Sequence, residues 1–361
     1  MHPCVFIIFS LLLLCPETTS ANQLAAVGGG DDDNGAVNRC FKKEKDGLLH
    51  FKGLLQDPYD CLSTWTVEQD NCCEWSRVTC NNQTGGHVTE LEVVSCGLVG
   101  EIRHALVNLT YLNYLDLFGN SFHGTIPTII SSLTQLGVLD LSFNSLYGTI
   151  PLEFGNLTNL EWLFLSNFGR CRVENLEWLS NLSHLEELHM DGISLAKTNH
   201  WVDVILSLPK LSVLSLSGCE LSQVMYPYSS SFLNSSYSSS IEYLSLGNNS
   251  LTSSMYRWLF PLTSNSLIYL DLSGNMLDGI PKYLGNLSSL GWLFFHSNSA
   301  AVKFPDFLKN LSGCTSRLSA SGSQFTGSLP DSTVLAPAFA LHLLSNIPSA
   351  SSSLSPPNLT S

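Results

Sequence analysis

Residues 109–132 (LTYLNYLDLFGNSFHGTIPTIISS) and 133–156 (LTQLGVLDLSFNSLYGTIPLEFGN) align without a gap. Both follow the frame L-x-x-L-x-x-L-x-L-x-x-N-x-x-x-G-x-I-P within a period of 24 residues. A fixed period of this size indicates a solenoid, in which each unit packs mainly on its two neighbours. The sequence therefore predicts one long array in place of several independent domains.

The frame is that of the leucine-rich repeat, and it extends through most of the chain. Its apolar positions recur in nine units between Val88 and Phe295, and in a damaged tenth unit Ala320 replaces a leucine. We expect an α/β solenoid, a right-handed leucine-rich-repeat superhelix over residues 87–331 with a parallel β-sheet on the concave face. Beyond it the frame is lost, and an irregular tail rich in Ser and Pro is predicted over residues 332–361.

The residue types of the frame have physical roles. In L-x-L the leucines point to one side of a strand and the variable residues to the other, so the leucines of neighbouring coils form a continuous core. Gly124 and Gly148 permit a tight turn. An Asn side chain at one repeat position can bond backbone groups of the adjacent coil and form a ladder. We expect this of Asn120, Asn144, Asn249, Asn275 and Asn298.

The composition excludes several classes of protein. Of 361 residues 63 are Leu, and 16 Lys+Arg against 30 Asp+Glu give a net charge of −14. An acidic chain without basic clusters is a poor ligand for nucleic acid or anionic membrane surfaces. Phosphate loops, nucleophile elbows, paired-carboxylate spacings and kinase signatures do not occur in the sequence. We therefore expect that the chain has no enzymatic activity, no cofactor and no metal site.

The N-terminus resembles a secretion signal. Residues 5–15 form an apolar run of 11 that is too short to cross a bilayer, and small residues follow it. This predicts a signal peptide over residues 1–21 and then a flexible acidic linker over residues 22–38. A second apolar stretch of 18 or more residues does not occur, so we expect no membrane anchor in the mature chain. The secretory pathway provides an oxidising compartment, in which disulfides persist.

Nine Asn-x-Ser/Thr sequons support the same route, because a glycan tolerates only surface positions. Five of them immediately precede the leucine that starts a unit, which predicts a row of glycans along one edge of the solenoid. These are Asn108, Asn156, Asn181, Asn286 and Asn310, and the others are Asn82, Asn234, Asn248 and Asn358.

Residues 39–81 are predicted to form a cap that seals the first coil. Apolar residues from Phe41 to Leu55 recur at helical spacing, which predicts an amphipathic helix ended by Asp57-Pro58. Cys72 and Cys73 are adjacent, which disfavours a bridge between them.

We expect the cap to hold two disulfides, Cys40–Cys72 and Cys73–Cys80, each contributing roughly 2–4 kcal/mol. Cys61 is an additional cysteine that could compete for either bridge. A zinc site made of Cys72, Cys73, Cys80 and His87 is disfavoured in a secreted chain.

The cap resembles the plant-type leucine-rich-repeat N-terminal domain. Matching elements are Glu44-Lys45, Leu48-Leu49, Phe51-Lys52, Asp57-Pro58, Leu62 to Trp65, Cys72-Cys73, Trp75, Val78, Cys80 and Gly86 to Val88. The sequence departs from the family pattern at Gly47, Asn71 and Arg77. The G-x-I-P repeats are similar to the same class, and the nearest group is the plant receptor-like proteins.

This resemblance implies a location at the extracellular face of the plasma membrane, or in the apoplast if this chain is complete. It implies recognition of a peptide or protein ligand in defence or developmental signalling, through partner receptor kinases. The alternatives are a secreted protein resembling the polygalacturonase-inhibiting proteins, and a truncated chain without function. Length favours the inhibitor, whereas irregular insertions at residues 194–203 and 219–240 count against it.

Four cysteines in the repeat region need separate treatment. Cys96 and Cys219 fall at the Asn-ladder position, where Cys is an accepted substitute, so both are predicted to be buried thiols. Cys171 and Cys314 receive no assignment. The two insertions are predicted to be loops.

The variable strand positions form the candidate ligand face. Aromatic residues with scattered acids suit peptide or protein recognition, although the same aromatics could simply pack along the sheet. The candidates are Tyr114, Asp116, Trp162, Phe164, Glu187, His189, Tyr243, Tyr269, Asp271, Trp292, Phe294 and His296.

Overall fold

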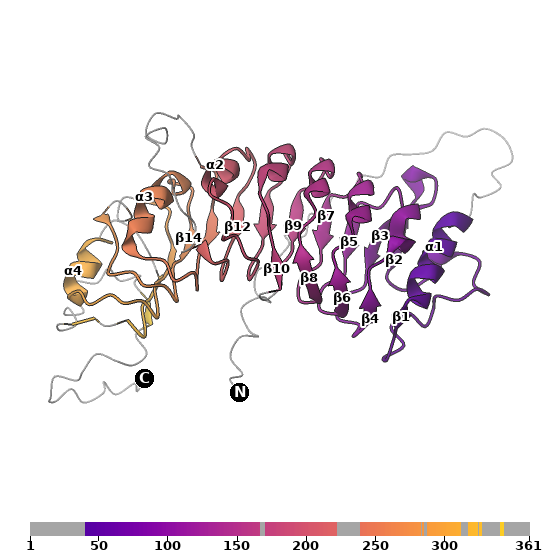
Figure 1. The fold of residues 1–361 in the computed structure, drawn as a ribbon, viewed down its shortest axis with the longest axis horizontal. Coiled ribbons are helices and arrows are strands. Elements are labelled where there is room, and N and C mark those ends of the chain that lie inside the picture. Colours follow the sequence, from indigo (N-terminus) through magenta and orange to yellow (C-terminus); the bar gives the residue numbers. More distant parts are fainter. Residues whose placement is uncertain are drawn as a thin grey trace, which may run out of the picture. The chain divides into compact units, whose positions relative to one another are not determined.

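The computed structural model describes residues 40–166, 170–221, 239–282, 284, 287–311, 317–323, 325–326 and 340–342. All of them belong to one compact unit, Asn38–Ser361, in which successive coils lie side by side (Figure 1). The expected signal peptide and linker, Cys314, residues 222–238 of the second insertion and most of the predicted tail lie outside the described residues.

One sheet of twelve strands runs through the described part of the array, and its strands follow chain order. The first strand, β2, is antiparallel to β3, and every later strand is parallel to the one before it. The strands are β2 (Val78–Asn81), β3 (His87–Glu92), β5 (Tyr114–Asp116), β7 (Val138–Asp140), β9 (Trp162–Phe164), β11 (Glu187–His189), β12 (Val213–Ser215), β13 (Tyr243–Ser245), β14 (Tyr269–Asp271), β15 (Trp292–Phe294), β16 (Arg317–Ser319) and β17 (Ala340–His342).

A second sheet and a row of short helices complete the coils. The second sheet contains β1 (Leu55–Gln56), β4 (Val99–Glu101), β6 (Ser121–Thr125), β8 (Ser145–Thr149) and β10 (Cys171–Arg172). The 3₁₀ helices of the repeats are η3 (His104–Asn108), η4 (Thr128–Ser132), η5 (Leu152–Asn156), η6 (Glu177–Asn181), η9 (Ser253–Met255) and η10 (Phe260–Leu262), and the α-helices are α2 (Trp201–Leu206), α3 (Tyr256–Leu259) and α4 (Phe304–Lys309). Figure 1 shows these helices along one side of the array. The predicted solenoid is confirmed.

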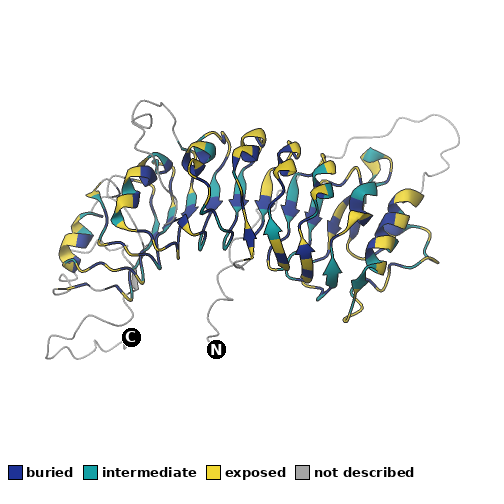
Figure 2. Cartoon of the chain, viewed as in Figure 1, coloured by how far each residue is buried: buried dark blue, intermediate teal, exposed yellow. Residues whose placement is uncertain are grey.

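The leucines of the frame form the core. Leu91, Leu115 and Leu139 lie in register on adjacent strands, and each is 0% exposed. Figure 2 shows buried residues running through the strands, while exposed residues gather on the helices. Burial of one leucine side chain contributes about 1.5–3 kcal/mol, and here every coil supplies several.

The Asn ladder forms as expected. In Asn275 the side-chain oxygen accepts hydrogen bonds from the backbone N–H groups of Asn249 and Leu251, at 3.1 and 2.9 Å. Its Nδ2 atom donates to the backbone oxygens of Leu246 and Leu272, both at 3.0 Å. Each such side chain therefore joins its own coil to the preceding one.

The cap helix α1 (Lys42–Gly53) ends earlier than the sequence analysis predicted. Leu55, expected on the helix, instead lies in β1 and pairs with Gly100 of β4. Asp57 acts after the helix: its carboxylate accepts hydrogen bonds from the N–H groups of Cys61 and Leu62 and so shapes the following loop. The cap also contains η1 (Cys72–Glu74), and η2 (Asn82–Thr84) follows β2.

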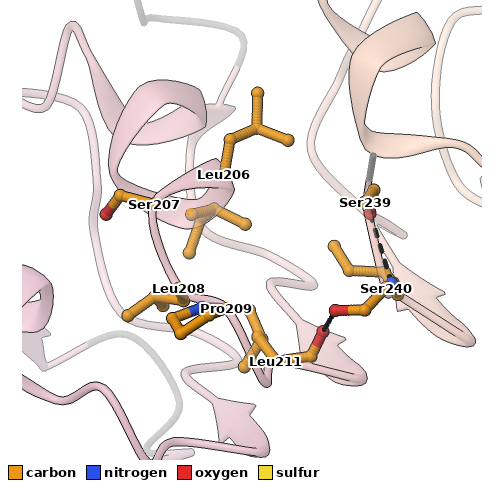
Figure 3. A pocket seen from close by; sticks show the side chains of 9 residues that line it. Leu206, Ser207, Leu208, Pro209, Leu211, Ser239 and Ser240 are labelled. Atoms are coloured by element: carbon orange, nitrogen blue, oxygen red, sulfur yellow. Dashed lines mark hydrogen bonds between the residues drawn. The ribbon is translucent and has the colours of Figure 1, made fainter. Parts of the chain in front are cut away.

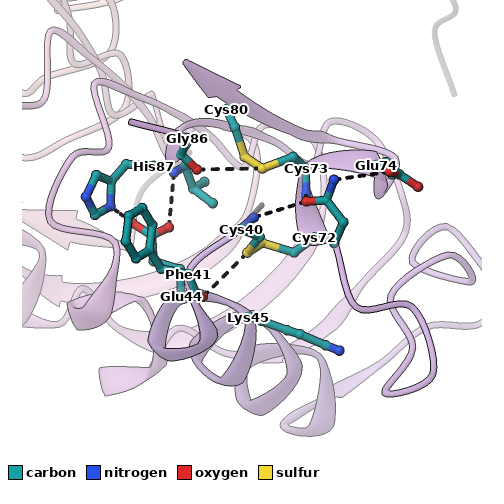
Figure 4. The surroundings of a disulfide bond; sticks show 12 residues. Cys40, Phe41, Glu44, Lys45, Cys72, Cys73, Glu74, Cys80, Gly86 and His87 are labelled. Carbon is teal, nitrogen blue, oxygen red and sulfur yellow. Dashed lines mark hydrogen bonds and ion pairs between the residues drawn. A yellow bond between two sulfur atoms is a disulfide. The ribbon is translucent and has the colours of Figure 1, made fainter. Parts of the chain in front are cut away.

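Disulfides and a buried carboxylate attach the cap to the first coil. Cys40 is bonded to Cys72 and Cys73 to Cys80, the two pairings expected from the sequence (Figure 4). The Glu44 carboxylate, 2% exposed, accepts a hydrogen bond from the Val88 N–H and lies 2.8 Å from His87 Nδ1. His87 is therefore engaged by Glu44, and the imagined zinc ligands Cys72, Cys73 and Cys80 are disulfide-bonded.

The prediction for Cys96 is wrong, because this residue forms a third disulfide with Cys61. Cys96 does occupy the ladder position, and its N–H donates to Asn120 Oδ1 at 3.1 Å. It belongs to the first coil, however, where the preceding neighbour is the cap loop that carries Cys61. Cys219, deep in the array, is a free buried thiol as predicted. Cys171 is buried on β10, and its Sγ donates to the Leu146 oxygen.

Two segments expected to be irregular contain regular structure. The first insertion leads into α2, whose Trp201 is 1% exposed and packs edge-on against Trp258. In the tail, β17 continues the parallel sheet beside β16, with Leu341 aligned on Leu318. The sequence that begins at Leu341, LHLLSN, fits the repeat pattern L-x-L-x-x-N. This pattern could have predicted the strand.

Replacing a ladder asparagine tests the role of the ladder. Asn275→Ala removes the acceptor for two buried N–H groups and the donor to two carbonyls, so we expect a loss of about 2–4 kcal/mol in the free energy of unfolding. Urea denaturation followed by circular dichroism measures it. Asn265→Ala, at an exposed position, is the matched control and should change stability by less than about 0.5 kcal/mol. Equal stabilities of the two variants would contradict the ladder role.

Candidate functional site

The open face of the twelve-stranded sheet presents two rows of variable side chains. In most strands the middle leucine is buried and its two neighbours point outward, so each strand adds one residue to each row. All twelve candidates from the sequence lie on this face, His296 two residues beyond the end of β15. They are half-buried, apart from Trp162, which is 39% exposed.

Acidic residues occupy the first strands of this face. Glu92, Asp116 and Asp140 stand in register on β3, β5 and β7, and Glu90 precedes Glu92 in the other row. Adjacent strands are about 4.8 Å apart, so these carboxylates repel one another. We call Glu90, Glu92, Asp116 and Asp140 the acidic end. The sequence analysis selected only Asp116, although the other three flank ladder leucines in the same frame.

Partial burial changes the ionisation of the acidic end. Loss of solvation raises the pKa of Asp140 to about 6; the Asp116 carboxylate adds to this, while the hydrogen bond from the Ser142 N–H opposes it. The pKa of Asp116 is raised mainly by burial. Burial and the nearby carboxylates raise the pKa of Tyr114 to about 12. The hydrogen bonds to Asp116 and Asp140 therefore do not fully compensate these carboxylates for their loss of solvation.

A hydrogen-bonded network of polar residues lies in the middle of the face. Asp191, which the sequence analysis missed, accepts hydrogen bonds from Ser215 Oγ at 2.7 Å and from Ser166 Oγ at 3.2 Å. Ser217 and Ser245 are joined through their hydroxyls at 2.8 Å. This network spans β9 to β13, and the larger side chains of Trp162 and Phe164 on β9 and of Glu187 and His189 on β11 lie in the same part of the face.

Aromatic residues occupy the last part of the face. Tyr243 and Tyr269 stack with centroids 4.1 Å apart, and Tyr269 lies 5.1 Å from Phe294. Trp292 lies on the same strand as Phe294, with parallel rings 6.3 Å apart. We call Tyr243, Tyr269, Trp292 and Phe294 the aromatic end. The rings pack along the sheet, as the alternative interpretation expected, yet they remain partly accessible.

A cavity of about 400 Å³ lies elsewhere, where the end of α2 meets the start of the next coil (Figure 3). Its lining is mainly aliphatic, including Leu206, Leu208 and Leu211. Its serines are engaged: Ser240 Oγ donates to the Leu211 oxygen, and Ser239 Oγ accepts from the Ile241 N–H. The lining residues lack titratable groups, so the sheet face is the stronger candidate for a site.

The sequons differ in exposure. Asn82, Asn156, Asn181 and Asn248 are exposed, whereas Asn108 and Asn310 are half-buried, and Asn310 Nδ2 donates to the Ile280 oxygen at 3.0 Å. Asn156 and Asn181 end the equivalent helices η5 and η6. Asn234, Asn286 and Asn358 lie outside the described residues.

Two parts of the sequence match known families. Residues 91–330 match the leucine-rich repeat region, and residues 41–81 match the leucine rich repeat N-terminal domain. The chain belongs to the leucine-rich-repeat family. The two tomato relatives described next confirm the resemblance to plant receptor-like proteins.

Two tomato (Solanum lycopersicum) proteins are similar in sequence to this leucine-rich-repeat chain. Receptor-like protein EIX1 is 34% identical over 282 residues, covering 73% of this chain and 27% of the relative. Receptor-like protein EIX2 is 35% identical over 322 residues, covering 78% of this chain and 31% of the relative. The chain thus spans about three tenths of the length of these relatives.

Solved structures of plant leucine-rich-repeat ectodomains share the fold. The Arabidopsis receptor kinase HAESA, in complex with the peptide hormone IDA and the co-receptor SERK1, superposes with a TM-score of 0.62 and is 26% identical, over 80% of this chain and 47% of that chain. The Arabidopsis ectodomain of GASSHO1/SCHENGEN3, in complex with CASPARIAN STRIP INTEGRITY FACTOR 2, superposes with a TM-score of 0.56 and is 27% identical. The match covers 79% of this chain and 36% of that chain. None of the helices among the described residues is long and apolar enough to span a bilayer.

The raised pKa of Asp140 predicts a pH dependence of stability. The native protein holds this proton more tightly than the unfolded chain, so the stability that this group contributes is lost as pH rises from 3.8 to about 6. The groups facing Asp140 are Asp116 and Tyr114 on β5, Ser142 beyond its own strand, and His189 on β11. Asp140→Asn removes this titration while keeping an acceptor for Ser142.

We expect the variant to gain about 1–2 kcal/mol over the unsubstituted protein between about pH 4 and pH 7.5. Urea denaturation at the two pH values measures the difference. A difference independent of pH would show that Asp140 titrates as an ordinary exposed carboxyl.

Proposed function

We propose that this chain is an extracellular recognition module that binds a peptide or protein ligand on the open face of its sheet. It acts as part of a receptor-like protein in plant defence or developmental signalling, through partner receptor kinases. We include no catalytic role, since the two tomato relatives EIX1 and EIX2 are receptor-like proteins.

The observation that carries the proposal is that the middle residue of each strand and its two neighbours have different roles. The fold uses the middle leucine, which is buried, and does not require the identity of the two flanking residues. Here those positions hold Tyr, Trp, Phe, Asp and Glu across neighbouring coils. Aromatic residues are enriched in the hot spots of protein interfaces, because they supply large contact areas at low entropic cost.

The related ectodomains support the choice of ligand class. HAESA was solved with a peptide hormone and a co-receptor, and GASSHO1/SCHENGEN3 with CASPARIAN STRIP INTEGRITY FACTOR 2. By analogy the partners of this chain are a peptide and a receptor kinase. This is an argument from shared fold, and the residues of the open face give it specific content.

The exposed sequons support a secretory route and the extracellular location. With glycans on Asn156 and Asn181, the edge formed by η5 and η6 would be covered by sugar. The open face of the sheet would remain accessible, because its candidate residues lie on the strands and not at the ends of these helices.

Loss of aromatic surface tests the recognition role. The secreted chain is panned against a random 12-residue peptide library displayed on phage, beside the quadruple variant Trp162→Ala, Phe164→Ala, Trp292→Ala and Phe294→Ala. We expect the unsubstituted chain to enrich peptides with related sequences. Enrichment of the same peptides by the quadruple variant should be at least ten-fold lower. Tyr147→Ala with Phe260→Ala, at residues 51% and 55% exposed outside this face, is the matched control and should enrich normally. Thermal unfolding of each variant establishes that it is folded. Undiminished enrichment by a folded quadruple variant would remove the open face as the binding surface.

Mass spectrometry tests the glycan edge. Asn156→Gln and Asn181→Gln should each lower the intact mass of the secreted protein by one glycan, with a change in stability below about 0.5 kcal/mol because both side chains are exposed. An unchanged mass in both variants would contradict a glycosylated edge.

A further inference from the structure

The chemistry of the open face changes along the array. Across its two rows the acidic end covers β3 to β7 and the aromatic end covers β13 to β15. The strands between them carry Trp162 and Phe164 on β9, Glu187 and His189 on β11, and Val213 and Ser215 on β12. Between β3 and β15 neither row contains Lys or Arg; the nearest Lys or Arg in register is Arg317 on β16. The face therefore carries negative charge at one end and apolar contact area at the other.

We infer that the ligand is an extended bipolar peptide, with Lys or Arg side chains over β3 to β7 and aromatic or aliphatic side chains over β13 to β15. The inference rests on the proposed function and adds the chemical class of the ligand and the order of its groups along the array.

Charge complementarity argues for basic groups at the acidic end. Asp116 and Asp140 are neighbours of like charge on adjacent strands, partly desolvated, and their main partners are local: the Phe118 N–H for Asp116 and the Ser142 N–H for Asp140. A guanidinium or ammonium placed between them would relieve the repulsion and form charge-assisted hydrogen bonds.

Aromatic rings border the same carboxylates. Phe118 and Phe143 lie at the end of β5 and β7, with centroids 5.1 Å apart, and Phe143 is 42% exposed. Tyr114 donates its hydroxyl hydrogen to Asp116 Oδ2 at 3.3 Å. A cation beside such rings is attracted by their faces as well as by the carboxylates. Neutral sugars, which also stack on aromatic rings, would leave the carboxylates unpaired.

The aromatic end offers a different surface. The rings of Tyr243, Tyr269 and Phe294 contact one another in sequence over three strands. Carboxylates are sparse there, and Asp271 is the one in register. The Nδ1 atom of His296 is buried and has no hydrogen-bond partner among the described residues. Apolar ligand side chains would gain contact area here, and one polar ligand group could reach His296.

Strand spacing sets the separation of the two ligand halves. Four strand steps separate β7 from β13 in the sheet order, which is about 19 Å at about 4.8 Å per step. An extended peptide covers this distance with about six residues. The intervening strands carry larger side chains at Trp162, which is 39% exposed, and small ones at Ser215 and Ser245, 6% and 4% exposed, over which a peptide backbone can approach closely.

Synthetic peptides test this order of groups by calorimetric titration into the full secreted chain. The reference peptide is KRK-GSGSGS-WFW, and its variants replace KRK by EDE, replace WFW by SSS, or shorten the spacer to GS. We expect the reference to bind at least ten-fold more tightly than each variant. Equal or tighter binding of the EDE peptide would overturn the inference.

Substitutions assign the effect to named residues. Asp116→Asn with Asp140→Asn should lower the affinity for the reference peptide about ten-fold and leave that for the EDE peptide unchanged. Asp203→Asn with Asp306→Asn, exposed on α2 and α4, is the matched control and should have no effect. An equal loss for both peptides would show that the acidic pair acts only through the fold.

The library selection separates this inference from the proposed function. Enriched peptides that depend on the open face but lack basic and apolar blocks would overturn the bipolar ligand and leave peptide recognition standing. Absence of enrichment by the unsubstituted chain would count against the proposed function itself.

Discussion

The stacking of ladder leucines between adjacent coils is the interaction on which this structure depends. Leu91, Leu115, Leu139 and their equivalents are completely buried, and each coil obtains that burial only from its neighbours and the cap. The asparagine side chains fix the same stacking by satisfying backbone groups of two coils. Because the core uses every second strand residue, the outward positions are free to carry recognition chemistry.

Much of the fold and the face could be predicted from periodicity, and the failures have common causes. The strands and the twelve face residues follow from position in the frame. The frame could not reveal Cys61–Cys96, because that bridge joins the cap to a ladder position, or the end of α1 at Gly53, which depends on the pairing of β1 with β4. Glu92, Asp140 and Asp191 were missed because single acids in a sequence show their proximity only when coils stack.

The acidic and aromatic ends illustrate how a linear array separates chemistries. Residues about 24 positions apart become neighbours about 4.8 Å apart, so a gradient of composition along the sequence becomes a gradient across a surface. At the acidic end the fold tolerates partly desolvated carboxylates, with a pKa of about 6 for Asp140, whose repulsion a basic ligand would relieve. Binding of a basic ligand would offset the free-energy cost of burying these carboxylates side by side.

The open face of the sheet is the proposed ligand-binding surface of this chain. Photo-cross-linking measures this directly: peptides enriched by the purified chain are made with a benzophenone side chain and irradiated in the complex, and the adducts are mapped by mass spectrometry. If the open face binds the peptide, adducts are expected on outward residues of β5 to β15, such as Trp162 and Tyr243. Adducts confined to the helices η3 to η6 and α2 to α4, on other parts of the coils, would contradict it.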